Sequence, residues 1–235
     1  MGNYKPYPFK IPFTRPVTIP FKRPFDVPDD CILCLIPEIR TKWFDQSING
    51  FDATIYNCEI TNGRFGMGLL FNNDDSYTEI LNLSGSGLLT AAKGTMGIWV
   101  KSFEVIAVTQ MLFLLSGYKP VIALNNGDLY TVWSGSTDMG GAGGNRTNKY
   151  SLSLNTWHLI IFKWDTGTYW LKLDDVELET TTGCTFTATG GITTYVGGDN
   201  TANSRNNCVD EAWIFNRKTT DEEDTRLYDI GKPEG

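Results

Sequence analysis

The sequence lacks residues and segments that several common classes of protein need. Its 235 residues include one histidine and no G-x-S-x-G motif, so the histidine-activated nucleophiles of hydrolases have little to build on. The most apolar stretch, residues 105–115, is interrupted by Thr109 and Gln110 and is much shorter than the ~20 residues of a membrane-spanning helix. Acidic residues (27) outnumber basic ones (20), which disfavours binding to nucleic acid phosphates. We therefore expect a soluble protein with neither nucleic acid partners nor membrane insertion.

A secretory signal is also lacking at the start of the sequence. The first residues, MGNYKPYPFKIPF, carry prolines where a signal peptide has an unbroken apolar segment. We therefore expect synthesis in the cytoplasm without a signal peptide.

Cysteine is scarce and odd in number, so the five cysteines cannot all pair within a monomer. Cys31 and Cys34 form a C-x-x-C inside the apolar run CILCLI, but no second C-x-x-C or nearby histidine completes a tetrahedral zinc shell. A free cysteine packs like a small apolar side chain. We interpret the cysteines as buried strand thiols, with zinc or redox chemistry as the less favoured alternative.

Proline is concentrated at the N-terminus. Seven of the ten prolines fall in the first 28 residues, and from Pro8 to Pro28 they recur at every fourth position, a spacing that forbids a helix. In an extended chain the odd-numbered side chains share one face, and here that face is apolar. The apolar residues are Phe9, Ile11, Phe13, Val17, Ile19, Phe21, Phe25 and Val27.

The same prolines leave one edge of this segment able to form hydrogen bonds. All prolines from Pro8 to Pro28 are even-numbered, and because backbone N–H groups alternate sides, the missing donors lie on one edge only. Residues 1–25 also carry a charge of +5, which leaves -12 for the rest of the -7 total. We call residues 1–30 the arm and predict that residues 1–28 anchor the protein to other subunits of an assembly. A disordered proline-rich tail is the alternative.

The rest of the chain alternates apolar and polar residues in short runs separated by Gly, Asn, Asp and Ser. This period of two predicts strands. Turn-forming residues within residues 124–128 and 164–168 predict two hairpins. Only the segment 219–228 predicts a helix, because threonine hydroxyls that can cap it are followed by acidic residues. The strand spacing predicts an all-β sandwich or jelly roll.

Motifs in both halves of the chain carry a resemblance to a known family. They are residues 45–54 (DQSINGFDAT), 63–66 (GRFG), 97–101 (GIWVK), 155–158 (NTWH), 195–198 (YVGG) and 209–217 (VDEAWIFNR). In order and spacing, the chain from about residue 31 to 232 resembles laminin-G-like, concanavalin A-like lectin domains. The resemblance implies a two-sheet antiparallel jelly-roll sandwich in which the first strand returns beside the last. We therefore expect this domain over residues 31–235, with a short C-terminal helix and the unrelated arm in front.

Some concanavalin A-like folds are glycoside hydrolases, whose retaining chemistry needs two carboxylates about 5.5 Å apart. An E-x-D-x-x-E strand supplies them, and the nearest segment here, KLDDVE at residues 172–177, has Lys172 in place of the first glutamate. We interpret Asp174 and Asp175 as a turn. The family resemblance marks the single histidine, His158, as part of a structural strand start. We therefore predict no catalytic residues, no enzymatic activity and no required cofactor.

Calcium is the metal that this family resemblance suggests, because oxygen-rich loops suit a hard cation. Asp45 and Asn49 in the first loop would converge with Asp210 near the last strand if those strands are neighbours. These three residues are the candidate ligands of a structural calcium ion. Ordinary loop roles, or ion pairs of Asp210 and Glu211 with Arg64 or Arg217, are the alternative.

Two loops offer a rim for ligand recognition. Residues 134–148 and 197–207 are rich in small polar residues, which hydrogen-bond to sugars but also simply make turns. The candidate rim residues are Trp133, Asp138, Asn145, Asp199 and Asn200.

We therefore predict a non-catalytic structural or decoration protein on the surface of a larger assembly, with a virus or phage particle as the preferred assembly. The arm would anchor it, and the lectin-like domain would be displayed towards surface glycans. A free carbohydrate-binding lectin module is the alternative.

Overall fold

The computed structural model of the protein describes residues 30–39, 42–83, 86–105, 109–115, 121–132, 150–183, 193–198 and 206–231. The arm up to residue 29 lies outside the described residues, so the anchoring roles of Phe9, Ile11, Phe13, Val17, Ile19, Phe21, Phe25 and Val27 stay predictions.

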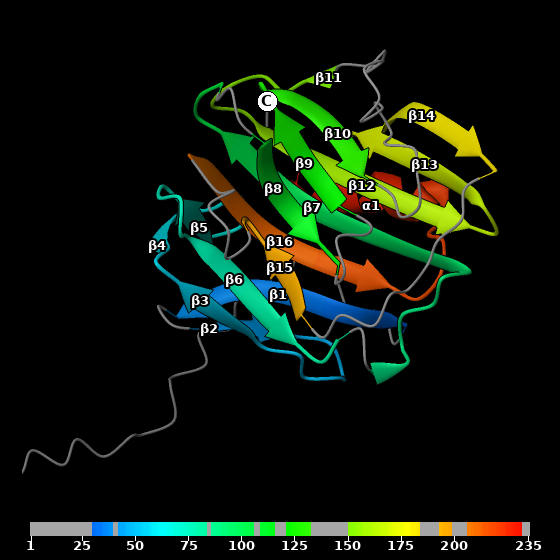
Figure 1. Ribbon diagram of the computed structural model, residues 1–235, viewed down its shortest axis with the longest axis horizontal. Coiled ribbons are helices and arrows are strands. Elements are labelled where there is room, and N and C mark those ends of the chain that lie inside the picture. The colour runs from blue at the N-terminus through cyan, green and yellow to red at the C-terminus, as the bar shows by residue number, and fades with distance from the viewer. Residues whose placement is uncertain are drawn as a thin grey trace, which may run out of the picture.

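Two antiparallel layers face each other across a common core (Figure 1). The back layer has the order β1-β16-β7-β12-β13-β14, and the front layer has the order β11-β10-β9-β8-β15-β6-β3. Strand β2 (Lys42–Asp45) pairs with both β1 and β3 and so connects the layers. The predicted all-β, two-sheet antiparallel sandwich is confirmed.

The back strands are β1 (Cys31–Ile39), β16 (Asn207–Phe215), β7 (Lys93–Ser102), β12 (Trp157–Asp165), β13 (Thr168–Leu173) and β14 (Val176–Thr182). The front strands are β11 (Tyr150–Ser151), β10 (Asp128–Val132), β9 (Val121–Asn125), β8 (Thr109–Leu114), β15 (Thr193–Val196), β6 (Tyr77–Leu81) and β3 (Ala53–Tyr56). Strand β4 (Glu59–Asn62) pairs with β5 (Met67–Phe71), which also pairs with β16. The first strand, β1, does lie beside the last, β16.

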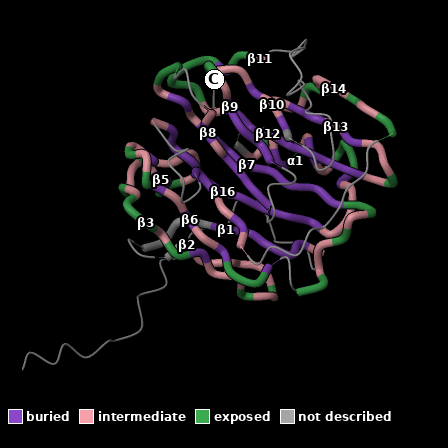
Figure 2. Tube along the Cα trace, viewed as in Figure 1, coloured by how far each residue is buried: buried purple, intermediate pink, exposed green. Residues whose placement is uncertain are grey.

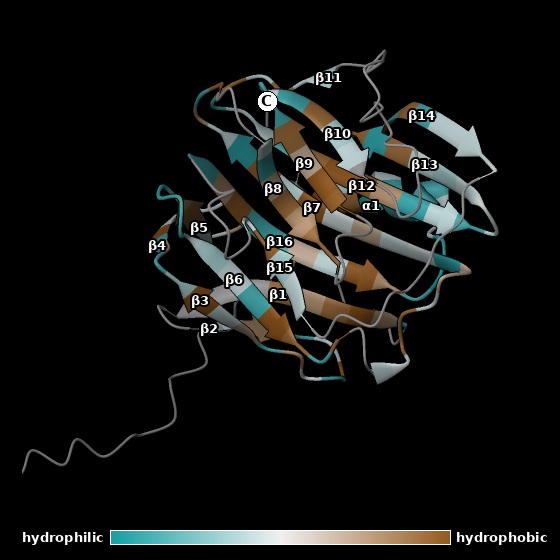
Figure 3. Ribbon diagram, in the orientation of Figure 1, coloured by the Kyte–Doolittle hydropathy of each residue, from teal (hydrophilic) through white to brown (hydrophobic). Residues whose placement is uncertain are grey.

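The main core lies between the layers, and a second apolar cluster lies on the outer side of the back layer. Strand β16 is buried along its whole length because both of its faces are covered (Figure 2). Helix α1 (Asp221–Gly231) contributes Leu227 and Tyr228 to the outer cluster. Apolar residues concentrate along strands such as β9, whereas β14 at the edge is more polar (Figure 3).

A β-bulge decides where the C-x-x-C cysteines point. The register of β1 against β16 shifts between Cys31 and Leu33, which places Cys31 and Cys34 together in the outer cluster while Leu33 packs in the main core. Both thiols are buried and unpaired, as is that of Cys208, so the prediction of buried strand thiols is confirmed for these three. Cys58 is half-buried, and Cys184 lies outside the described residues.

The predicted turns and helix cap are confirmed. Asn126-Gly127, Thr166-Gly167 and Asp174-Asp175 all have positive φ angles, as two-residue hairpin turns of type I′ require. Thr220 Oγ1 accepts the backbone N–H of Glu223 (3.2 Å), and the Glu223 carboxylate accepts the N–H of Thr220 (2.8 Å). This reciprocal pair is a capping box that begins α1.

Candidate functional site

Three tyrosines from distant parts of the chain meet on the outer side of the front layer. Thr78 and Ile80 of β6 are buried, so the alternation of the strand turns Tyr77 and Glu79 outward. Register places Tyr56 of β3 opposite Tyr77, and Tyr195 of β15 opposite Glu79. We call Tyr56, Tyr77, Glu79 and Tyr195 the tyrosine face.

The rings of the tyrosine face contact one another in sequence across the strands. Tyr56 and Tyr77 stack with centroids 4.6 Å apart and planes at 20°, and Tyr195 meets Tyr77 edge-on at 5.8 Å. The Tyr56 hydroxyl donates to Glu79 Oε2 at 3.2 Å. Tyr56 remains 36% exposed. A tyrosine ring held on a sheet in this way combines apolar surface with a hydroxyl donor, which suits a ligand that is apolar on one side and polar at its edge.

Two hydroxyls of the tyrosine face, those of Tyr56 and Tyr77, have a raised pKa. Partial burial, together with the negative charge of Glu79, raises the pKa of both Tyr56 and Tyr77 above the ordinary tyrosine value. The two hydroxyls therefore stay hydrogen-bond donors across the physiological pH range.

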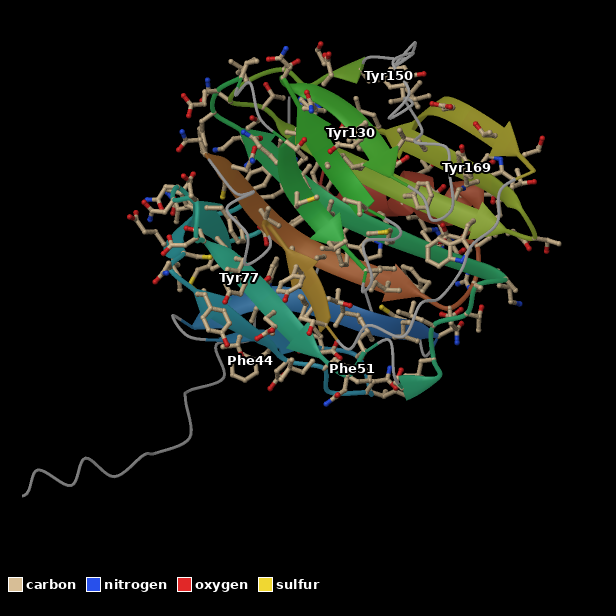
Figure 4. All side chains as sticks on the ribbon, viewed as in Figure 1. Phe44, Phe51, Tyr77, Tyr130, Tyr150 and Tyr169 are labelled. Carbon is tan, nitrogen blue, oxygen red and sulfur yellow. The ribbon has the colours of Figure 1, made fainter. Side chains whose placement is uncertain are left out.

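The same side of the front layer continues as a buried apolar cluster towards β10. Leu114, Val121 and Ala123 form a buried cluster there, and Met111, Tyr130 and Tyr195 pack against it. Figure 4 shows Tyr77 on β6 and Tyr130 on β10, both belonging to the front layer. Tyr195 thus connects the tyrosine face to this cluster.

The structure brings two of the three candidate calcium ligands together. Asp45 accepts hydrogen bonds from the backbone of Cys34, Ser47 and Phe51 at 2.7–2.9 Å and from the Ser47 hydroxyl at 2.8 Å. Asn49 Nδ2 donates to the same Ser47 Oγ at 3.3 Å. The Asp45 carboxylate therefore organises its own loop.

Asp210, the third candidate ligand, organises a different loop. Its Oδ2 accepts the backbone N–H of Phe65 at 2.8 Å, and a Cβ added to Gly63 would lie 2.4 Å from the same oxygen. Within the described residues, no group of three His, Cys, Asp or Glu side chains is arranged to hold a metal ion. The bound calcium stays a prediction.

Asp210 and its neighbour Glu211 sit at a β-bulge in β16 and are both buried. Burial raises the pKa of Asp210 to about 6. Burial, with the nearby charge of Asp210 as a second cause, raises the pKa of Glu211 to about 8. Glu211 is therefore mostly protonated at neutral pH. The Arg64 guanidinium lies over the Trp99 ring at 5.5 Å. Its charge lowers the pKa of Asp210, and the ion-pair alternative is borne out to the extent of this nearby charge.

Side chains of residues 172–177, the segment compared with a glycosidase strand, are hydrogen-bonded to other parts of the domain. Lys172 donates to Asp175 (3.0 Å) and to the buried Asp224 of α1 (3.1 Å). His158 Nδ1 lies 2.6 Å from Asp174 Oδ2, and the other oxygen of Asp174 accepts the N–H of Leu159 at 2.9 Å. These contacts join the β13–β14 turn to α1 and to the start of β12.

The candidate residues of the predicted ligand rim lie outside the described residues. This applies to Trp133, Asp138, Asn145, Asp199 and Asn200, so their role stays a prediction. The tyrosine face, by contrast, was missed from the sequence. Its only signal there is that each tyrosine occupies a polar position of an alternating strand, and the register that joins the three strands cannot be read from local patterns.

No protein-family model matches the sequence, and no curated protein does. Among solved structures, the chain is similar to Trypanosoma rangeli sialidase in complex with sialic acid, with 14% identity and a TM-score of 0.63 over 86% of this chain and 33% of that one. It is also similar to the binding domain of Paraclostridial Mosquitocidal Protein 1, with 15% identity and a TM-score of 0.66 over 85% of this chain and 52% of the other. A third similar structure is the binding domain of botulinum neurotoxin serotype D/C, with 13% identity and a TM-score of 0.62 over 87% of this chain and 53% of the other.

These likenesses show the fold. The chain spans a third to about half of the length of those proteins, and the identities are too low to transfer an activity. The structural neighbours confirm the β-sandwich fold, while the laminin-G-like family itself stays a hypothesis. No helix in the described part of the chain is long and apolar enough to cross a membrane.

Proposed function

We propose that this chain is a non-catalytic, lectin-like module that binds carbohydrate while its arm fastens it to a larger assembly. A virus or phage particle is the assembly we favour, since a lectin that acts alone needs no extended segment with an apolar face. The observation that carries the binding half is the tyrosine face, an outward aromatic surface on a rigid sheet.

Carbohydrate fits the tyrosine face in chemistry. The CH groups of a sugar ring can cover the apolar ring of Tyr56, while sugar hydroxyls meet the Tyr56 hydroxyl and the Glu79 carboxylate. Two of the structural neighbours are called binding domains, and a third is a sialidase complexed with sialic acid, which supports this class of ligand.

The absence of catalysis is supported by how the titratable side chains are used. Lys172 stands where a glycosidase strand would carry a carboxylate, and its ammonium group is held by Asp175 and Asp224. His158 is held by Asp174. Lys172, His158 and Asp174 are thus each bonded to another titratable side chain of the scaffold.

A glycan array tests the binding proposal and separates its two candidate sites. Binding that is lost in Tyr56→Ala and only weakened in Tyr56→Phe places the contact on the ring of the tyrosine face. Binding that survives Tyr56→Ala but is lost on deletion of residues 138–146 places it on the predicted rim. Absence of binding to every glycan contradicts the lectin half of the proposal.

The anchoring half has its own test. Deleting residues 2–28 should abolish incorporation into the assembly and leave the thermal unfolding of the domain nearly unchanged. Phe13→Ala with Phe21→Ala should weaken docking, because each buried phenylalanine contributes roughly 1.5–3 kcal/mol before ordering costs. Lys10→Ala is the control and should have little effect. Unfolding of the truncated protein would instead assign the arm to the domain's own core.

A further inference from the structure

One strand of the sandwich has an edge whose chemistry complements the arm. Strand β14 ends the back layer, and among the described strands it pairs only with β13 (Figure 1). Building on the anchoring role proposed above, we propose that the arm of one copy adds to this edge of β14 in a second copy as an extra antiparallel or parallel strand.

Hydrogen-bonding groups of β14 point away from the sandwich. Asp165 and Thr168 flank a two-residue turn, so the backbone of Thr168 faces β12 and that of Tyr169 faces β14. Tyr169 is opposite Thr181, so Thr181 faces β13 and its neighbours Thr180 and Thr182 direct their N–H and C=O groups outward. The odd-numbered residues of the arm carry a complete set of N–H groups on one edge and can meet them.

Charge favours the arm over a second β14 strand. Strand β14 contains Glu177 and Glu179 and no basic residue, whereas residues 1–25 carry +5 and no acid. Like charges placed opposite each other on neighbouring strands are destabilising, so direct β14–β14 pairing is disfavoured while pairing with a basic strand is favoured.

Apolar side chains at the same edge offer a place for the phenylalanine face of the arm. Val176 is 60% exposed, and Leu178, which lies at a register shift of β14 against β13, is partly buried against the main core. The Leu178 carbonyl already accepts the Tyr150 hydroxyl at 2.6 Å, so the new backbone pairing centres on Thr180 and Thr182. Added Phe and Ile side chains would extend the core outward past Val176 and Leu178.

Geometry favours a second copy over the chain's own β14. One row of paired residues crosses the back layer from the start of β1 to β14, in the order Cys31, Phe215, Thr95, Lys163, Trp170 and Thr180. This row spans five strand spacings, or ~24 Å. An arm pairing with its own β14 would have to cross that distance and then turn to run along the strand. Residues 4–28 lack Gly and Asn, and because a proline at every fourth position favours an extended chain, we expect the arm to run outward rather than fold back.

Sedimentation velocity on the full-length chain tests this proposal. Wild type should form concentration-dependent oligomers at ~10–100 µM. Thr180→Pro removes an outward N–H and should weaken association about tenfold or more, whereas Thr180→Ala, which equally loses the hydroxyl bond to Glu177, should associate like wild type. Circular dichroism and thermal unfolding show whether each variant keeps its fold.

If Thr180→Pro does not fold, an exchange of charges between β14 and the arm tests the same contact. Glu177→Lys with Glu179→Lys should weaken self-association, as should Lys22→Glu with Arg23→Glu in the arm. Mixing the two variants should restore association, because each supplies the partner for the other. A wild type that stays monomeric at ~100 µM, or a mixture that does not associate, overturns the proposal. Incorporation of that monomer into a larger assembly through its arm would still support the anchoring function.

Discussion

Lys163 Nζ lies 2.5 Å from Asp224 Oδ2, and both side chains are almost completely buried between the back layer and α1. Lys172 reaches the same carboxylate oxygen at 3.1 Å, and the Thr219 hydroxyl donates to the other oxygen at 2.6 Å. Asp221, at the start of the helix, adds a contact to Lys163 at 3.1 Å. Two lysines from β12 and β13 thus hold the first turn of α1 against the sheet.

Removing one partner from this cluster should cost more than removing an ordinary surface charge. Asp224→Ala leaves the two lysines buried without their shared carboxylate, and we expect it to lower the free energy of unfolding by ~3–5 kcal/mol. Denaturant unfolding followed by tryptophan fluorescence measures this change. Lys93→Met, which removes an exposed charge from β7, is the control and should change stability by under ~0.5 kcal/mol. Similar losses for the two variants would show that the cluster does not hold the helix.

Buried Glu211 should make the protein less stable as the pH rises. Its pKa is raised from the ordinary 4.5 to about 8, so between those values the folded protein keeps a proton that the unfolded chain has lost. The free energy of unfolding therefore falls across this window and levels off above it. Asp210 adds a smaller fall between about pH 4 and 6.

Glu211→Gln should flatten this pH dependence and raise stability at neutral and alkaline pH. The amide is close in shape to the protonated acid and neutral in both the folded and the unfolded chain, so folding no longer has to take up a proton at this position. Unfolding free energies measured from pH 5 to 9 give the slope, and Glu104→Gln, at an exposed position, serves as the control. An unchanged slope in Glu211→Gln would contradict the assignment.

Hydrolysis of laminarin, agarose or sialosides should be undetectable. The Lys172 ammonium occupies the place of an essential carboxylate, and His158 and Asp174 are bonded to each other. Release of reducing sugar or sialic acid is the measurement. Turnover that disappears in Asp175→Asn, while the fold is retained by circular dichroism, would establish an active site in the β13–β14 turn.

The local chemistry of the chain was sufficient to predict much of this fold. Turn residues at 125–127 and 165–167 located two hairpins, and Thr220 with Glu223 located the start of α1, because those signals act over a few residues. The bulge at Cys31–Leu33 was not predictable, since it depends on the register against β16, nearly the whole chain away.

The candidate sites divide in the same way. The loop role of Asp45 follows from neighbours within six residues, apart from its bond to Cys34. The tyrosine face forms only when strands that are far apart in sequence pair with each other. The ion pair of Lys163 with Asp224 likewise forms only when α1 packs on β12. Sequence periodicity marks which side chains share a face of one strand, but it does not say which strand lies beside it.

Gly97 of β7 lies directly beneath the ring of Trp213 of β16. A Cβ added to Gly97 would lie 2.6 Å from the Trp213 indole ring, which packs over the glycine from the paired position on β16. Strand β7 lies in the middle of the back layer and Trp213 is completely buried, so neither can move away easily. Gly97→Ala should therefore lower the free energy of unfolding by ~1–3 kcal/mol through overpacking. The same change in a Trp213→Phe background should cost clearly less, because the smaller ring leaves room for the methyl group. A double-mutant cycle measured by denaturant unfolding gives the coupling between the two positions, and strictly additive effects would show that the ring does not require a glycine at position 97.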